Sequence, residues 1–538
     1  MTRLARDTQR DPRWARVSVG AMVLLLGAAA CSSTAEDLLI MGGTTFDGTG
    51  GAPVVQDVAL SGDEITFVGD AVAAGITARD TISALGLWVT PGFIDMHSHA
   101  ELGEPWGKDG APFLYQGITT AVLGVDGGGE PEIEAQLLAF ADSGTGLNAA
   151  LYVGHGAVRR RVLGTDDRAP TGPELEEMKS LVRVAMEEGA LGLSSGLFYT
   201  PGYFAETEEV IELARVAAEY GGIYDTHDRD LGASYNGIGY LASIREGIRI
   251  GEEGGTRVIF SHFNAQGAAN YGRAVEGAAL IEEARARGVD VQAAQHVYTA
   301  TQSNLRAYAI PRWAAAGGDG AMRARFEHPD TAALLDVQTM EMLEIRGGAE
   351  KIHFSDPRPE LNGKNLAQVA EEWGLPVPET VRRILREGNA AVMNRDLYDP
   401  QNTRYLALQD WMMTCTDGRT PSPGTVITHP RPFGAFSKKI RDYVLDEGFL
   451  APEFVIRSMT GLAADFLGVG DRGYLRPGMK GDVAVIDPQR IRDRATYEEP
   501  QLPAEGTVHV LVNGTFALRD GALTGALGGR PIPRPASP

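Results

Sequence analysis

The sequence has only two cysteines in 538 residues, which excludes a fold held together by a network of disulfides. Basic residues are few relative to acidic ones, 49 against 71, and the net charge of −22 argues against nucleic acid as a partner. No internal repeat of about 20 to 50 residues is evident, so a solenoid is not expected. The 43% apolar and 22% charged residues are those of a globular chain, long enough for one large domain and a smaller companion.

The first thirty residues have the pattern of an export signal. Arginines are frequent in residues 1–16, an apolar run follows in 17–30, and small residues precede Cys31. That run is shorter than the roughly 20 residues that a membrane-spanning helix needs. We predict that 1–30 is a bacterial lipoprotein signal peptide and that Cys31 is lipidated. The protein would then be exported and lipid-anchored to the cell envelope, on the periplasmic or outer surface; export without lipidation is the alternative.

Both ends of the remaining chain consist of short strand-like runs separated by Gly and Asp turns. The N-terminal runs lie in residues 36–90 and the C-terminal runs in residues 461–538. Such runs are typical of a small β-rich module. We predict that the two ends combine into one small β-sandwich.

Between these ends, apolar strand-like runs alternate with amphipathic helical runs, which is the pattern of βα units around a parallel sheet. Eight such strands with intervening helices predict an α/β fold of the (β/α)8, TIM-like barrel type over residues 91–460. The expected strands lie within 92–99, 117–127, 147–156, 190–197, 221–229, 257–263, 289–298 and 411–418. The clearest helices between them are 131–141, 172–189, 205–221 and 276–288.

A long segment separates the seventh expected strand from the eighth. It contains further helical patterns at 331–347, 365–374 and 379–388. Because a structureless loop of that length is uncommon in a compact domain, we predict a folded helical insertion over 300–405 that covers the barrel mouth.

Histidine and aspartate stand at the carboxyl ends of the expected strands, where a (β/α)8 barrel carries its active site. The first strand ends in His97 and His99, whose side chains share a face because positions i and i+2 of a strand point the same way. Five of the ten histidines in the chain occupy such ends. Histidines with unrelated structural roles would not be expected to gather there. The strand-end residues are His97, His99, Asp126, His155, His227, His262 and Asp417.

Neutral imidazoles and carboxylates are the ligands of Zn²⁺ and similar divalent ions. The strand ends offer more ligands than one tetrahedral ion uses, so one or two ions are expected. A bound metal lowers the pKa of water and polarises a carbonyl group, and a free carboxylate oxygen can move the proton. The sequence therefore predicts a metal-dependent hydrolase.

The string GFIDMHSH at 92–99 resembles the first-strand motif of the amidohydrolase superfamily. More narrowly, most of the chain from residue 36 onward is similar to the D-aminoacylase, or N-acyl-D-amino-acid deacylase, family. The matching segments are 116–124, 154–156, 189–202, 226–230, 261–263, 416–418, 429–434, 478–487 and 511–514. The resemblance implies a metal-dependent barrel with a flanking β-sandwich that cleaves the linear amide bond of N-acyl-D-amino acids, or of dipeptides containing a D-residue.

The resemblance also assigns roles by position. The implied metal ligands are His97, His99, Asp126, His227, His262 and Asp417. Asp126 falls where D-aminoacylases commonly carry a cysteine, and we predict that it bridges two ions or completes the tight site. Asp417 would also be the catalytic proton shuttle. The carboxylated lysine that many amidohydrolases use has no candidate here, since Lys179 alone lies between 109 and 350, within a helical pattern.

Three residues are predicted to bind substrate. Arg431 and Tyr199 match family positions that hold the substrate's carboxylate, and a guanidinium suits that anion by bidentate hydrogen bonding. His155 is a minor further candidate for substrate binding; the alternatives are that it tunes the site from behind the metal ligands or that it only satisfies a loop. A surface salt bridge for Arg431 and local packing for Tyr199 are the structural alternatives.

Two other functions compete with the deacylase. A cyclic-amide hydrolase, related to hydantoinase or dihydroorotase, would need a bridging lysine on the fourth strand, which ALGLSSGL lacks. A catalytically silent binding lipoprotein on the same barrel would be expected to lose ligands, yet each ligand type is present. The chain departs from the family at Gln295–Tyr298 and at Leu231, so the sequence does not identify the side chain of the preferred substrate. The sequence also does not predict an oligomeric state.

Overall fold

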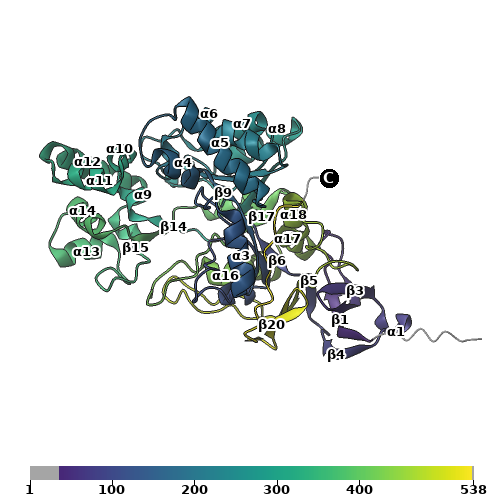
Figure 1. Cartoon of the computed structure of the whole chain (residues 1–538). Coiled ribbons are helices and arrows are strands. Elements are labelled where there is room, and N and C mark those ends of the chain that lie inside the picture. The colour runs from purple at the N-terminus through teal and green to yellow at the C-terminus, as the bar shows by residue number, and fades with distance from the viewer. Residues whose placement is uncertain (1–34, 536–538) are drawn as a thin grey trace, which may run out of the picture. The chain divides into compact units, whose positions relative to one another are not determined.

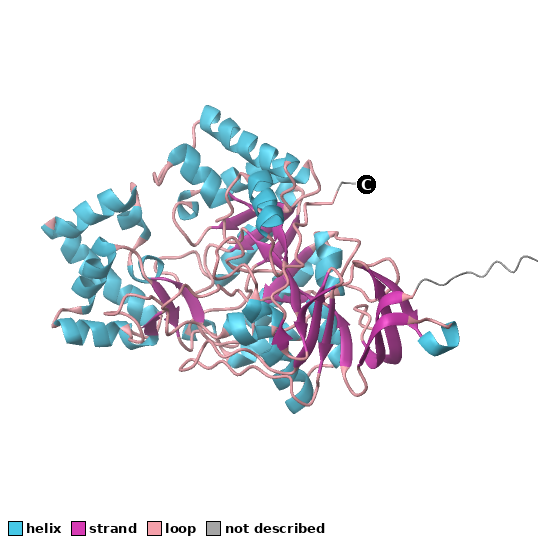
Figure 2. Cartoon of the chain, turned by 60° about the horizontal axis from the view of Figure 1, so that its bottom comes forward, coloured by secondary structure: helices cyan, strands magenta, loops and turns pink. Residues whose placement is uncertain are grey.

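The computed structural model describes residues 35–535, so the predicted signal peptide and Cys31 lie outside the described residues. Parallel strands alternate with helices through most of the described chain, which confirms the α/β fold class (Figures 1 and 2). In chain order these strands are β6 (Phe93–Asp95), β7 (Ile118–Leu123), β8 (Asn148–Leu151) with β9 (Val153–Gly154), β10 (Gly192–Gly196), β11 (Ile223–His227), β12 (Arg257–Phe260), β13 (Val291–Gln295) and β17 (Met412–Thr414).

Parallel pairing joins these strands in chain order. One sheet has the order β6-β7-β8, and a second has the order β9-β10-β11-β12-β13-β17. Only Tyr152 separates β8 from β9, so one continuous segment takes part in both sheets. Beyond the ends of β17 and β6, Asp417 N donates to His97 O and His99 N donates to Gly418 O, both at 2.9 Å. The last strand segment is thus hydrogen-bonded to the first.

Neighbouring residues of these strands pack on opposite sides. Phe93 and Met412 belong to the cluster shared with the surrounding helices, whereas Ile94 and Met413 join Ile223 in a separate cluster. Because both faces are buried, the strands read as continuous apolar runs.

Helices follow the strands. They are α2 (Ala111–Leu114), α3 (Ile133–Ser143), α4 (His155–Leu163), α5 (Gly172–Glu187), α6 (Thr207–Ala218), α7 (Tyr240–Gly254), α8 (Ala274–Ala286), α16 (Arg431–Lys438), α17 (Pro452–Met459) and α18 (Gly461–Leu467). The helices expected from periodicity are confirmed as α3, α5, α6 and α8. The other six, α2, α4, α7, α16, α17 and α18, were not predicted.

Both ends of the described chain contribute to one nine-stranded sheet. The N-terminal strands are β1 (Glu36–Thr45), β2 (Val54–Ser61), β3 (Glu64–Gly69), β4 (Ala78–Ser83) and β5 (Trp88–Pro91), and the C-terminal strands are β18 (Val483–Ile486), β19 (Thr507–Val512), β20 (Thr515–Arg519) and β21 (Ala522–Leu523). Antiparallel pairing of β5 with β18 joins the two groups, with Val89 opposite Val485. The sheet buries its own apolar cluster, which includes Ile40, Val58 and Leu511.

The segment between β13 and β17 is folded, with a hydrophobic cluster of its own. Its helices are α9 (Leu305–Ala309), α10 (Arg312–Ala315), α11 (Gly318–Glu327), α12 (Pro329–Ile345), α13 (Leu366–Trp373), α14 (Val377–Glu387) and α15 (Pro400–Ala407). It also contains a three-stranded antiparallel sheet in the order β14-β16-β15, formed by β14 (Thr301–Asn304), β15 (Ile352–Phe354) and β16 (Ala391–Asn394). These short strands were not predicted, so the insertion is α/β rather than purely helical (Figure 1).

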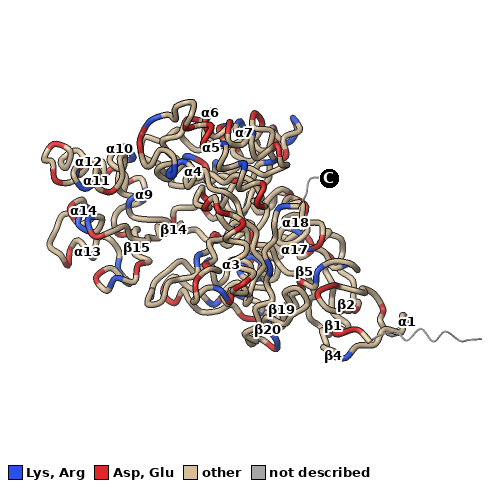
Figure 3. The backbone as a smooth tube through the Cα atoms, in the orientation of Figure 1, with Lys and Arg blue, Asp and Glu red and all other residues tan. Residues whose placement is uncertain are grey.

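Basic positions are interspersed with acidic ones along the described chain (Figure 3). Within residues 35–535, no helix is long and apolar enough to cross a membrane.

Candidate metal centre and active site

A cavity of about 1090 Å³ lies where the segments that follow the parallel strands meet the insertion. The strand side contributes His99, Asp126, His227, His262, Asp417 and Arg431 to its lining, and the insertion contributes Ser303, Tyr308 and Tyr398. Most of the strand-end residues that the sequence singled out therefore line one cavity.

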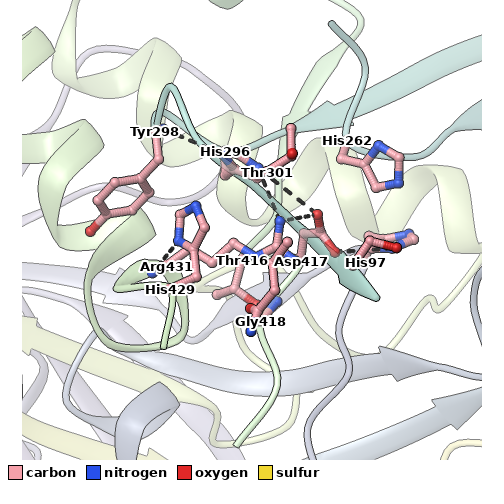
Figure 4. Close-up of polar contacts among 12 residues, drawn as sticks. His97, His262, His296, Tyr298, Thr301, Thr416, Asp417, Gly418, His429 and Arg431 are labelled. Carbon is pink, nitrogen blue, oxygen red and sulfur yellow. Dashed lines mark hydrogen bonds and ion pairs between the residues drawn. The ribbon is translucent and has the colours of Figure 1, made fainter. Parts of the chain in front are cut away.

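His97, His99 and the two predicted carboxylate ligands converge at one point. Figure 4 shows His97 beside Asp417. His97 Nε2 lies 3.5 Å from Asp126 Oδ1 and 3.6 Å from Asp417 Oδ1. His99 Nε2 lies 3.4 Å from Asp126 Oδ2 and 3.4 Å from Asp417 Oδ1. Ligand atoms of His97, His99 and Asp126 all fall within 4.8 Å of one another, a spacing that a single ion can span.

His227 and His262 form the adjoining pair. Their rings are 4.5 Å apart, and the His262 ring lies 5.1 Å from that of His97. Asp126 Oδ1 is 3.7 Å from His262 Nε2, so this carboxylate faces both groups of histidines. His227 Nδ1 is 3.0 Å from the Asp228 carbonyl oxygen, to which it donates when it carries the proton, and this leaves Nε2 free as a ligand atom.

The loops that follow the strands hold three of these residues in an unusual backbone conformation. Asp126, His262 and Asp417 have φ angles of 57°, 32° and 49°, in the left-handed region that non-glycine residues rarely adopt. Such strain persists where the surrounding structure fixes the chain, and it clusters at functional sites.

Contacts behind the cluster fix Asp126 and Asp417. At Gly196, a Cβ atom would lie 2.1 Å from the Asp126 carbonyl oxygen, so β10 approaches this loop closely only because the residue is glycine. The buried Asp95 carboxylate accepts hydrogen bonds from Thr416 N and Oγ1, next to Asp417. Burial raises the pKa of Asp95 to about 7.

Burial and nearby charge set the protonation of the histidines. Burial lowers the pKa of His97 to about 3 and that of His227 to about 4, so both imidazoles are neutral near pH 7, as metal ligands must be. Although burial opposes it, Asp126 and Asp417 raise the pKa of His99 to about 9. The two carboxylates therefore favour a positive charge at this point.

The donor set fits a metal ion. Within the described chain, His97 Nε2 and Asp126 Oδ1 are buried and have no hydrogen-bond partner. Unpartnered buried polar atoms cost free energy, and an ion bound between these two atoms would offset that cost. His97, His99, Asp126, His227, His262 and Asp417 could hold one or two divalent ions.

Arg431 and Tyr199 both border the cavity. The Arg431 guanidinium forms an ion pair with Asp417 Oδ2, and neither side chain is more than 8% exposed (Figure 4). The alternative of a surface salt bridge for Arg431 is therefore wrong. The Tyr199 ring lies 4.8 Å from that of His227, and its hydroxyl accepts a hydrogen bond from Ser303 of the insertion at 3.2 Å.

His155 lies elsewhere. It begins α4, and its Nε2 is 2.8 Å from Glu209 Oε1, with Arg159 also paired to Glu209. This buried group ties α4 to α6. His155 is not among the residues that line the cavity, so the structure gives no support to substrate binding by His155.

His296 and His429 were not predicted. His296 follows β13, and its Nε2 lies 3.4 Å from Arg431 Nη1 and 3.9 Å from Asp417 Oδ2. His429 Nδ1 accepts a hydrogen bond from Arg431 N at 3.1 Å. The position of His296 at the end of the seventh strand was the available signal.

Together, the parallel strands and the histidine–aspartate cluster at their carboxyl ends define the class of metal-dependent α/β hydrolases. Comparison with known proteins agrees with this class. The sequence profile described as "Amidohydrolase family" matches residues 224–517. A D-aminoacylase of Alcaligenes xylosoxydans xylosoxydans is 32% identical over 93% of this chain and 98% of its own. The chain therefore belongs to the D-aminoacylase family of amidohydrolases.

Two solved structures are also similar. A crystal structure of D-aminoacylase superimposes with a TM-score of 0.79 at 30% identity, over 93% of this chain and all of its own. The N-acyl-D-glutamate deacylase of Bordetella bronchiseptica, complexed with zinc and a phosphonate inhibitor, gives a TM-score of 0.78 at 28% identity over 93% of this chain and 100% of its own.

Proposed function

We propose that this protein is a metal-dependent hydrolase that cleaves the amide bond of N-acyl-D-amino acids. The observation that carries the proposal is a single cluster of metal-ligand residues in a chain that belongs to the D-aminoacylase family. In this cluster His97, His99 and His262 face Asp126 or Asp417, and His227 adjoins His262. The zinc bound by the deacylase of B. bronchiseptica supports one or two Zn²⁺ ions at these ligands. A bound divalent ion would lower the pKa of water and polarise the scissile carbonyl group.

The chain's own residues supply the proton transfer. Asp417 Oδ1 faces His97 and His99, whereas Oδ2 is held by Arg431. Oδ1 accepts the proton of the attacking water as the water oxygen bonds to the amide carbon. Asp417 then passes this proton to the amide nitrogen as the carbon–nitrogen bond breaks, so that a carboxylic acid and a free D-amino acid are released.

Arg431 and Tyr199 position the substrate through its carboxylate. Both side chains border the cavity beside the metal-ligand cluster. A carboxylate fixed there orients the α-carbon relative to the scissile bond, so the side chains of D- and L-residues point in different directions. Only one enantiomer can then place its amide at the cluster.

The cyclic-amide alternative is not favoured. It needs a bridging lysine, but Lys179 lies on α5, where its ammonium pairs with Glu212 at 2.6 Å and with Glu176 at 3.2 Å. A silent binding protein would not need the complete ligand set that the cavity presents.

The proposal extends to architecture and location. The hydrogen bonds between the segments after β6 and β17 support one closed (β/α)8 barrel over 91–460, with the 300–405 insertion beside its mouth. The shared nine-stranded sheet supports a small β-sandwich formed by 36–90 and 461–538. The sequence of residues 1–31 supports export and lipid anchoring at Cys31.

A panel of N-acetyl-D- and N-acetyl-L-amino acids, assayed for released amine, tests this function. The zinc-loaded protein should hydrolyse D-substrates, and His262→Ala should lose both activity and tightly bound metal. Equal hydrolysis of both enantiomers, or full turnover with unchanged metal content in the variant, would refute the proposal.

A further inference from the structure

A second, smaller cavity of about 150 Å³ adjoins the active-site cavity on the side of the insertion. The residues that line both cavities are Phe198, Tyr199, Thr200, Asn304 and Asn389. Phe198 connects this side cavity to the metal-ligand cluster, because its ring stacks on that of His227 at 5.3 Å and 15°. The side cavity is therefore placed to receive one end of a molecule whose other end lies at the cluster.

Arg312 lines the side cavity without a carboxylate partner. Its Cζ lies 4.4 Å from the centre of the Phe198 ring, and Nη1 donates to the Ala307 carbonyl at 3.0 Å. A second guanidinium, that of the buried Arg346, lies over Tyr308 at 4.0 Å and within 5.7 Å of the Phe198 ring. Arg312 Nε and Arg346 Nη1 have no hydrogen-bond partner, and no carboxylate of residues 35–535 forms an ion pair with either arginine.

Arg346 is buried and Arg312 is half-buried, so each has lost part or all of its hydration, and the two charges repel each other. The pair is therefore costly without a counterion. Burial, and then the charge of Arg346, lower the pKa of Arg312 to about 10. The negative charge of Asp230 partly offsets the positive charges of Arg312 and Arg346. The Asp230 carboxylate is not paired with either arginine, however, and instead accepts hydrogen bonds from Gly232 N at 2.6 Å and Gly239 N at 2.7 Å. The side cavity therefore carries excess positive charge.

We propose that the side cavity binds a second anionic group of the substrate, a carboxylate, in addition to the α-carboxylate held at Arg431. A planar guanidinium on the cavity wall offers paired N–H donors to such a group. This inference rests on the proposed function, which places the scissile amide at the metal-ligand cluster. The carboxylate can belong either to the side chain of the D-residue or to the acyl group.

Two matched pairs of substrates distinguish these sources. N-acetyl-D-glutamate is compared with N-acetyl-D-glutamine, and N-succinyl-D-leucine with N-butanoyl-D-leucine. In at least one pair the zinc-loaded wild type should show a kcat/KM about 10-fold or more higher for the anionic member, the effect of one charge-assisted hydrogen bond. Arg312→Met should abolish that preference by slowing the anionic substrate alone, and Arg312→Lys should retain part of it.

Arg383→Met is the matched control, since Arg383 is exposed and stacks at 4.1 Å on Trp373 of the same insertion. Arg383→Met should leave kcat/KM unchanged for both the anionic and the neutral member of each pair. Circular dichroism should show that the Arg312 variants are folded. Wild type that discriminates in neither pair, or equal losses for both members in Arg312→Met, would overturn the proposal.

A binding measurement separates this inference from the proposed function. By calorimetry, glutarate should bind the zinc-loaded wild type about 10-fold or more tightly than its monoamide, and Arg312→Met should bind the two alike. If no N-acyl-D-amino acid is hydrolysed, the proposed function fails while this result still decides the anion site. Equal binding of glutarate and its monoamide to the wild type refutes the site itself.

Discussion

The Arg431 guanidinium is paired with the Asp417 carboxylate at the centre of the site, and the pair is buried. One oxygen of Asp417 is engaged by this cation, while the other faces His97 and His99. Arg431, which we propose binds the substrate's carboxylate, therefore also orients Asp417, which we propose transfers the proton. Replacing Arg431 should affect substrate binding and proton transfer, and the two effects can be measured separately.

Arg431→Ala should therefore lower kcat for every substrate and raise KM only for substrates with a free α-carboxylate. The charged hydrogen bond to the substrate is worth about 1.5–3 kcal/mol, whereas an amide or ester of the same substrate makes only a weaker, neutral contact. Kinetics on N-acetyl-D-leucine and N-acetyl-D-leucinamide separate the two effects. Equal KM changes for acid and amide would mean that Arg431 does not contact the carboxylate.

Asp417→Asn should reduce kcat by about 10²- to 10⁴-fold, because asparagine can face the histidines but cannot accept a proton. Metal content should fall far less, since the amide oxygen remains available as a ligand. Metal analysis beside steady-state kinetics checks this. Normal turnover after zinc is resupplied to a metal-depleted variant would contradict the proton-shuttle role.

Asp126→Cys should retain measurable activity, whereas Asp126→Leu should not. Asp126 faces His97, His99 and His262, and a thiolate is an alternative zinc ligand with similar reach. Leucine offers no ligand atom to the metal and removes the negative charge that faces the imidazoles. If the two variants hold the same amount of zinc, Asp126 is not a ligand.

Lys439 should lower stability at acidic and neutral pH. Its ammonium is fully buried and donates to Thr414 Oγ1 at 2.8 Å and Ser458 Oγ at 3.3 Å, and burial lowers its pKa from 10.5 to about 7. Between pH 7 and 10.5 the unfolded chain binds this proton more strongly, so the contribution of Lys439 to the free energy of unfolding rises with pH across that window.

Lys439→Met should then be more stable than wild type at pH 6, by roughly 2 kcal/mol, with a smaller gain at pH 9. The two hydroxyls stay satisfied, since Ser458 Oγ donates to Val455 O at 2.7 Å and lies 3.1 Å from Thr414 Oγ1. Urea unfolding at both pH values measures the difference. A variant that is destabilised equally at both would show that the hydrogen bonds of Lys439 outweigh the burial of its charge.

The strand ends could be read from the sequence because their physics is local. Continuous apolar runs mark strands buried on both faces, and period two puts His97 and His99 on one side. Parallel strands then bring all their carboxyl ends together, which predicted the convergence of residues as distant in sequence as His97 and Asp417.

Other features depend on packing between distant elements. The pair of His155 with Glu209 arises where α4 meets α6, and no spacing rule connects these residues. The strand Thr301–Asn304 is polar and short, so its alternation carries no signal. The Arg431–Asp417 pair depends on how the start of α16 packs against the loop that follows β17, which the sequence does not specify.

The most direct test of the account measures amine release from N-acetyl-D-methionine and its L-enantiomer before and after zinc is removed by a chelator and restored. The account predicts hydrolysis of the D-enantiomer alone, its loss on chelation, and its recovery with Zn²⁺ in wild type but not in His227→Ala. Undiminished hydrolysis by protein shown to be metal-free, or equal hydrolysis of both enantiomers, would contradict it.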